Sequence, residues 1–118
     1  REVARHCDQM AVMMYDAGQR IPKAYRRLMA DWTQEVLAWS PATAVLLGAP
    51  TYDDSGVEYH HAGVENLPAA LLGIHAGLAR QPLPACYQGV AIYSEWETTE
   101  DEWAHFRRHF LRSPKIGP

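Results

Sequence analysis

The feature that most limits the fold of this chain is a set of three short apolar runs, each followed by a polar or aromatic corner. The runs cover residues 9–15, 44–49 and 89–93. None of them alternates apolar and polar residues along its length, as a half-exposed strand would, so each is expected to be a strand covered on both faces. Short strands of this kind are typical of parallel sheets.

Helical patterns separate the three runs. The first begins near Pro22, which suits the first turn of a helix, and repeats apolar residues at three- and four-residue steps as far as Trp39. A second stripe repeats at steps of four, three and four over residues 67–78, and Pro68 is tolerated in its first turn. Two helices are therefore predicted between the strands.

A third helix is predicted after the last apolar run. Thr99 followed three residues later by Glu102 matches a capping box, in which each residue satisfies a backbone group of the other. This helix is expected to present Trp103, Phe106, Phe110 and Leu111 on one side. The large aromatic residues on helical stripes are predicted to be core residues: Trp32, Trp39, Trp103, Phe106 and Phe110.

Strand and helix thus alternate three times. This order predicts an α/β fold of three consecutive βα units with a parallel sheet, joined by right-handed crossovers. A chain of 118 residues suffices for one domain but is short of the roughly 250 residues of an eight-stranded TIM barrel. Residues 1–118 are therefore expected to form a single partial (βα) barrel-like domain.

Composition excludes several classes of protein. The net charge is −3 and no basic stripe is present, which argues against a nucleic-acid partner. No apolar run approaches the ~20 residues that cross a bilayer, so no membrane association is expected. Two cysteines, Cys7 and Cys86, are too few for a disulfide framework and are expected to be reduced. A soluble, cytoplasmic protein is favoured; the alternative is a chain from which an export signal has been removed.

The residues that follow the apolar runs are the candidates for ligand contact. In parallel α/β architectures, ligands bind at the carboxyl edge of the strands, and here each strand ends in tyrosine and carboxylate residues. Sugar contact and ordinary loop packing both explain the aromatic residues at these ends. The candidate substrate-binding residues are Tyr15, Asp16, Tyr52, Asp53, Tyr93, Glu95 and Trp96.

The three strand ends, taken in order, resemble strands six, seven and eight of the chitinase-like glycoside hydrolases of family 18. The matching motifs are Met-Met-Tyr-Asp at residues 13–16, Leu-Gly-Ala-Pro-Thr-Tyr at 47–52 and Gly-Val-Ala-Ile-Tyr at 89–93. The resemblance implies that Tyr15 and Asp16 hold the sugar where the glycosidic bond is broken, and that Tyr52 lines the cleft. Tyr93 stands where the family usually has Trp, and Trp96 is the nearest replacement for the stacking ring.

The family's Asp-x-x-Asp-x-Asp-x-Glu strand, which carries the general acid, does not occur in these 118 residues. Glycoside hydrolysis needs a proton donor and a nucleophile or its substrate-assisted equivalent. The resemblance therefore implies a glycan-binding, catalytically incomplete fragment with an oligosaccharide ligand. The catalytic residues are left unassigned, and no cofactor is implied. The alternative is a noncatalytic protein that uses the same fold for self-assembly.

A second cluster of polar residues, which includes His60 and His61, follows the second strand. Carboxylates and imidazoles are metal ligands, but adjacent histidines point in opposite directions in an extended chain, and no known ligand spacing is matched. A solvated or hydrogen-bonded loop without metal is the favoured interpretation. Because the helices of such a fragment cover one side of the sheet only, a homo-oligomer that covers the open face and the strand edges is predicted.

Overall fold

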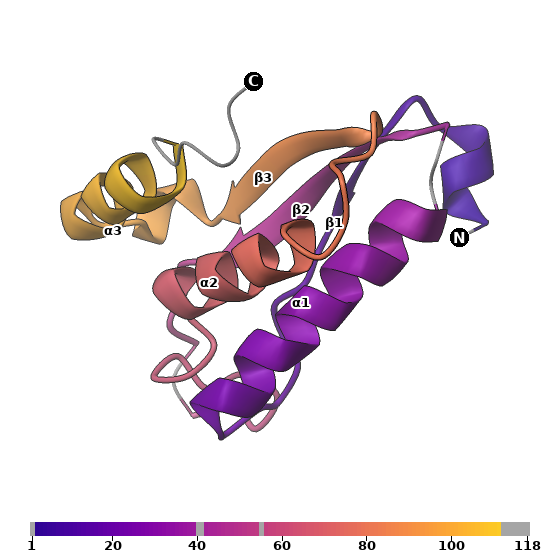
Figure 1. Ribbon diagram of the computed structural model, residues 1–118. Helices are drawn as coiled ribbons and strands as arrows, with labels where there is room; N and C mark the ends of the chain where they lie inside the picture. The colour runs from indigo at the N-terminus through magenta and orange to yellow at the C-terminus, as the bar shows by residue number, and fades with distance from the viewer. Residues whose placement is uncertain (1, 40–41, 55, 112–118) are drawn as a thin grey trace.

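The computed structural model describes residues 2–39, 42–54 and 56–111 (Figure 1). Its three strands form one parallel sheet in the order β1-β2-β3, and a helix follows each strand. The prediction of an α/β fold with three βα units is confirmed. The elements are a 3-10 turn Val3–His6, β1 Gln9–Val12, α1 Pro22–Trp39, β2 Ala44–Pro50, α2 Leu67–Leu78, β3 Tyr87–Tyr93, a 3-10 turn Glu95–Glu97, α3 Glu100–Phe106 and a π turn Arg107–Leu111.

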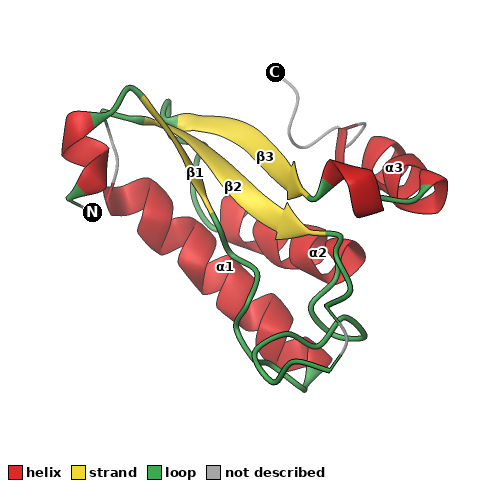
Figure 2. Cartoon of the chain, turned by 180° about the vertical axis from the view of Figure 1, so that it is seen from behind, coloured by secondary structure: helices red, strands yellow, loops and turns green. Residues whose placement is uncertain are grey.

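Helices α1 and α2 lie side by side on one face of the sheet (Figure 1). Seen from behind, the opposite face of the sheet is turned towards the viewer, and no helix of the described residues crosses it (Figure 2). We call this side the open face. This arrangement agrees with the expectation that the helices of such a fragment cover one side of the sheet only. Helix α3 lies beyond the end of β3 and contacts α2.

The core lies between the central strand and the two packed helices. Val45, Leu47 and Ala49 of β2 are fully buried, and they alternate along the strand so that all three point towards the helices. The two helices approach each other closely at Gly73. A Cβ atom at this position would lie 2.5 Å from the Cβ of Met29 and 2.6 Å from the carbonyl oxygen of Arg26. The contact between α1 and α2 therefore depends on the absence of a side chain.

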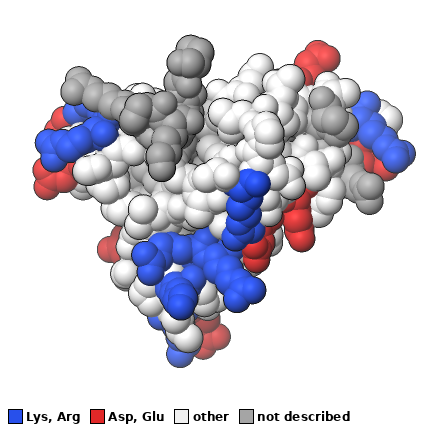
Figure 3. Space-filling model, in the orientation of Figure 1, with Lys and Arg blue, Asp and Glu red and all other residues white. Residues whose placement is uncertain are grey.

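The outer surface of the helix layer is charged. Figure 3 shows Lys and Arg side chains gathered over the part of the molecule where α1 begins in Figure 1, with Asp and Glu side chains near them. Arg80 forms an ion pair with Asp31 at 2.7 Å and donates a hydrogen bond to Gln34 at 3.0 Å, so it joins α2 to α1 on this surface. Solvated charges are the usual outer layer of a helix-covered sheet.

The first strand is shorter than predicted. It pairs with β2 over four positions, from Gln9 beside Ala44 to Val12 beside Leu47, and then ends. The reason is the Tyr15 ring, which lies over Gly48 of β2: a Cβ at Gly48 would be 2.8 Å from Tyr15 Cε1. The chain leaves the sheet to bring the ring to this place.

The predicted helix boundaries agree with the structure, but two predicted core residues, Trp39 and Trp103, do not. Trp103 is only partly buried and lies outside the core cluster. The capping box is present, since Thr99 Oγ1 accepts from the Glu102 amide at 3.2 Å and Glu102 Oε1 accepts from the Thr99 amide at 3.0 Å. Phe110 is buried, whereas the Trp39 side chain is 45% exposed. Trp39 lies at the end of α1 beside a groove that no described element fills, so the prediction that it belongs to the core is wrong.

Candidate functional site

Four aromatic residues gather at the carboxyl ends of β2 and β3 and after β1. We call Tyr15, Tyr52, Tyr93 and Trp96 the aromatic cluster. Tyr15 stacks on Tyr93 with ring centroids 5.6 Å apart, and Tyr52 meets both rings edge-on at 5.8 and 5.7 Å. Trp96 stands edge-on to Tyr93 at 5.5 Å. Such edge-to-face and offset contacts are the favourable arrangements of aromatic pairs.

The cluster has a buried base and an exposed rim. Tyr15 and Tyr52 are buried, whereas Tyr93 is 46% exposed and Trp96 is 73% exposed. The rings of Tyr93 and Trp96 are inclined by 82° to one another. Two aromatic surfaces at nearly a right angle therefore face solvent at the carboxyl edge of the sheet.

Sheet geometry explains why these rings meet. Pro50 of β2 lies beside Tyr93 of β3 in the register, so the two strands end together. Gly48, two residues before Pro50, shares its side of the strand and leaves room on the open face for the Tyr15 ring. Tyrosines from three segments that are far apart in the sequence therefore contact one another at the carboxyl edge of the sheet.

The turn after β3 is held by hydrogen bonds to the end of β2. The Thr51 amide donates to the carbonyl of Tyr93 at 2.7 Å. The hydroxyls of Thr51 and Thr98 donate to the carbonyl of Ser94 at 2.9 and 2.7 Å. These bonds fix the 3-10 turn that carries Trp96.

Asp16 is the carboxylate of the aromatic cluster. The Tyr52 hydroxyl donates a hydrogen bond to Asp16 Oδ1, and the Asp16 side chain is 43% exposed. Among the described residues, no hydrogen bond engages Asp16 Oδ2. Burial, followed by the bond to Asp16, raises the pKa of Tyr52 above its ordinary value, so its hydroxyl remains a donor even in alkaline solution. Burial also raises the pKa of Tyr15, and the electrostatic influence of Tyr93 and Asp16 raises it further.

Glu65 holds two loops together beneath Asp16. Its side chain is fully buried, and its Oε2 accepts from the amides of Ala17 at 2.9 Å and Gln19 at 3.3 Å. Its Oε1 accepts from the His61 amide at 2.9 Å. The loop after β1 is therefore tied to the loop after β2 by one carboxylate. The sequence reasoning missed Glu65, because an acid just before a predicted helix is normally solvated.

His60 lies between these two carboxylates. Its side chain is fully buried, its ring stacks on Tyr52 at 4.4 Å, and its Nε2 is 3.2 Å from the Tyr52 carbonyl oxygen. Its Nδ1 is 3.4 Å from Asp16 Oδ1 and 3.7 Å from Glu65 Oε1, without a hydrogen bond to either. The expectation of a hydrogen-bonded loop thus describes His60. Of the described residues, no group of three or more His, Cys, Asp or Glu is arranged to hold a metal ion.

Five of the seven predicted site residues meet in this arrangement: Tyr15, Asp16, Tyr52, Tyr93 and Trp96. Asp53 is exposed and lines a separate open cleft of about 520 Å³ with Arg20, Glu58 and His60. Glu95 is exposed, and in the part of the chain that the structure describes it makes no side-chain hydrogen bond or ion pair. Among the described residues, no hydrogen bond or ion pair joins the side chain of Asp53 or Glu95 to the aromatic cluster.

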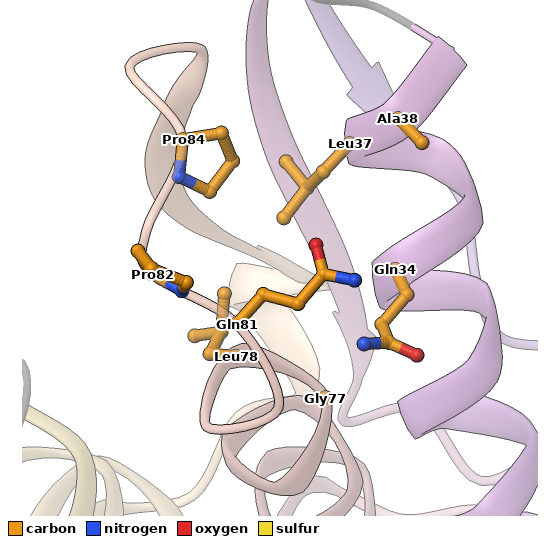
Figure 4. A pocket seen from close by; sticks show the side chains of 8 residues that line it. All are labelled: Gln34, Leu37, Ala38, Gly77, Leu78, Gln81, Pro82 and Pro84. Atoms are coloured by element: carbon orange, nitrogen blue, oxygen red, sulfur yellow. The ribbon is translucent and has the colours of Figure 1, made fainter.

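A second cavity lies away from the strand ends, between the last turns of α1 and α2 and the loop that follows α2 (Figure 4). Its volume is about 100 Å³, and its lining consists of Gln34, Leu37, Ala38, Gly77, Leu78, Gln81, Pro82 and Pro84. None of these eight lining residues carries an ionisable side chain.

Comparisons of the chain with family models, with curated proteins and with solved structures found no match. Of the described helices, none combines the length and the apolar character needed to cross a membrane. Cys7 and Cys86 are not joined to each other by a disulfide. The chemistry of the candidate site therefore has to be argued from its own geometry.

Proposed function

We propose that the chain binds an oligosaccharide at the aromatic cluster, as one part of a glycoside-hydrolase-like site. The observation that carries the proposal is the exposed pair Tyr93 and Trp96 beside the half-exposed carboxylate of Asp16. Sugar rings present C–H faces that pack on aromatic surfaces, and hydroxyl groups that need acceptors. Apolar surfaces with a few fixed polar groups are the usual composition of small-ligand sites.

Asp16 supplies the polar part of the proposed site. Its Oδ1 is occupied by the Tyr52 hydroxyl, which fixes the orientation of the carboxylate. Its Oδ2 is left to accept from a sugar hydroxyl or amide. Hydrogen bonds to an ionised acceptor are stronger than neutral ones, so one fixed carboxylate can orient a ligand that stacks on the neighbouring rings.

Hydrolysis requires a proton donor in addition to the groups of the aromatic cluster. The reaction needs a proton donor across the scissile bond in addition to a nucleophile or its substrate-assisted equivalent. Asp16 is the carboxylate that contacts the cluster, and Glu65 is fully buried and accepts three backbone amides. We therefore propose binding by this chain, with any hydrolysis dependent on a proton donor supplied by additional strands or by a partner.

A second candidate function is noncatalytic self-assembly. The observation that favours it is the outer edge of β1, which no other described strand pairs with and which adjoins an apolar groove with exposed Met13 and Trp39 side chains. Substitutions in the groove beside β1 and α1 test self-assembly, and substitutions in the exposed rim that follows β3 test saccharide binding.

Tryptophan fluorescence tests the saccharide proposal. Titration with N-acetylchitohexaose should give a saturable change in emission, because Trp96 is largely exposed at the site; cellohexaose and maltohexaose serve as comparison ligands. Trp96→Ala should remove the spectral change, and Tyr93→Ala should weaken binding about tenfold, equal to about 1.4 kcal/mol. Trp39→Ala, a change at an exposed tryptophan outside the site, should leave the affinity unchanged. No response to any of the three oligosaccharides from the folded protein would refute the proposal.

A further inference from the structure

The outer edge of β1 is unpaired. The sheet order is β1-β2-β3, so among the described residues no strand lies beside β1 on the side away from β2. A strand edge of this kind presents N–H and C=O groups that another strand can pair with. The edge is therefore able to accept one more parallel strand.

An apolar groove adjoins this edge on the helix side of the sheet. It has a volume of about 200 Å³ and lies between the end of β1 and helix α1. Met13 is 77% exposed and Trp39 is 45% exposed at its rim. Side chains of this size are seldom left open to water in a group. The lining consists of Val12, Met13, Met14, Trp32, Glu35, Val36 and Trp39.

Helix α1 presents a second, mostly apolar side towards the groove. Its contact with α2 runs along the side that carries Met29, Ala30 and Thr33, against Gly73 and Gly77 of α2. Leu28, Trp32, Glu35 and Trp39 follow one another at steps of four, three and four residues, which places them on another side of the same helix. This mostly apolar stripe of α1 has no described helix against it, so another helix can pack on it.

The edge of β1 and the groove therefore fit a parallel strand that is followed by a helix. The opposite edge of the same sheet provides both. Strand β3 has an unpaired outer edge within the described residues, and it is followed by α3. Leu111, just after α3, is 62% exposed, and Trp103 within α3 is only partly buried. The C-terminal unit thus carries apolar surface that no other described residue covers.

We propose that copies of this chain associate head to tail: β3 of one copy pairs in parallel with β1 of the next, and α3 of the first copy enters the groove of the second. Strand, helix and strand then follow one another across the contact in one parallel sheet, as they do along the chain. Such a contact is heterologous, because two different surfaces meet, and it adds copies until the ring closes.

Sedimentation velocity of the whole chain over a wide range of concentration tests the proposal. The weight-average mass should rise above the 13.3 kDa of one chain as the concentration increases. Trp39→Glu in the groove and Leu111→Glu at the C-terminal unit should each give a monomer. Leu72→Glu is the matched control, since Leu72 is 56% exposed on α2, and it should associate as the wild type does.

An equimolar mixture of Trp39→Glu and Leu111→Glu distinguishes head-to-tail contact from other modes. Each variant keeps the surface that the other has lost, so the mixture should form a dimer of one copy of each and nothing larger. Far-UV circular dichroism establishes that the variants are folded. A wild type that stays monomeric at every concentration would overturn the proposal, as would association that survives Trp39→Glu or a mixture that remains monomeric.

Discussion

Replacement of Glu65 by Gln is expected to destabilise the fold and to loosen the candidate site at the same time. The two side chains have nearly the same shape, so packing is preserved. The carboxylate accepts from three amides, those of Ala17, Gln19 and His61, through its two oxygens. The amide side chain has one oxygen only, so whichever way it is turned, its NH₂ group faces at least one backbone N–H.

The magnitude follows from these contacts. A buried N–H left without an acceptor costs about 1 to 3 kcal/mol, and the remaining bonds lose the extra strength that a charged acceptor gives. The sum is roughly 2 to 4 kcal/mol, a large part of the 5 to 15 kcal/mol that stabilises a typical domain. With a urea slope of about 2 kcal/mol per molar, the unfolding midpoint should fall by about 1 to 2 M.

Urea unfolding followed by far-UV circular dichroism measures this change. Glu58→Gln is the matched control, because Glu58 is exposed in the same loop and its side chain makes no hydrogen bond among the described residues. Its midpoint should equal that of the wild type. A free energy of unfolding for Glu65→Gln within about 0.5 kcal/mol of the control value would contradict the prediction, since surface substitutions alone stay within that range.

Three further predictions concern helix contact and pH. Gly73→Ala should lower the free energy of unfolding by about 1 to 3 kcal/mol through overpacking, although Ala is favoured over Gly in helices by about 1 kcal/mol. A gain in the free energy of unfolding, measured in urea, would contradict this prediction. The control is Ala76→Gly at an exposed position of α2, which should show the ordinary loss of about 1 kcal/mol. Because burial raises the pKa of Tyr52, its folded form keeps the proton above pH ~10, where the unfolded form loses it, so stability should be level below that pH and fall above it. Tyr52→Phe should make this fall less steep in urea unfolding; an unchanged slope would count against the assignment. Burial lowers the pKa of His75, so the stability of the fold should be full above pH ~6.5 and fall below it. His75→Leu should make this fall less steep in thermal unfolding. An equally steep fall in stability for the variant would contradict the prediction.

Local rules were enough to predict the helices from the sequence. The predicted stripe from Pro22 to Trp39 matches the observed bounds of α1, and the Thr99–Glu102 capping box is present in both of its hydrogen bonds. Each of these features depends on residues within a few positions of one another. The tyrosines at the strand ends were also predicted, because the carboxyl ends of parallel strands necessarily meet at one edge.

Features that depend on distant residues were not predicted. Glu65 is buried because amides 46 and 48 residues earlier in the chain meet its carboxylate, and no local pattern carries that information. Trp39 repeats at the correct helical step, yet its exposure depends on what packs against that side of α1. The first strand was expected to continue to Tyr15, but it ends at Val12 because the Tyr15 ring lies on β2 instead.

The absence of a side chain at Gly48 sets the depth of the candidate site. A Cβ atom there would lie 2.6 Å from the Val12 carbonyl oxygen and 2.9 Å from the Tyr15 hydroxyl oxygen, so the Tyr15 ring rests almost directly on the backbone of the central strand. Tyr93 stacks on that ring, and Trp96 stands against Tyr93, so their height above the sheet depends on the same position. Paired variation of residues 48 and 15 therefore offers a way to raise or lower the whole aromatic surface without altering the residues that face solvent.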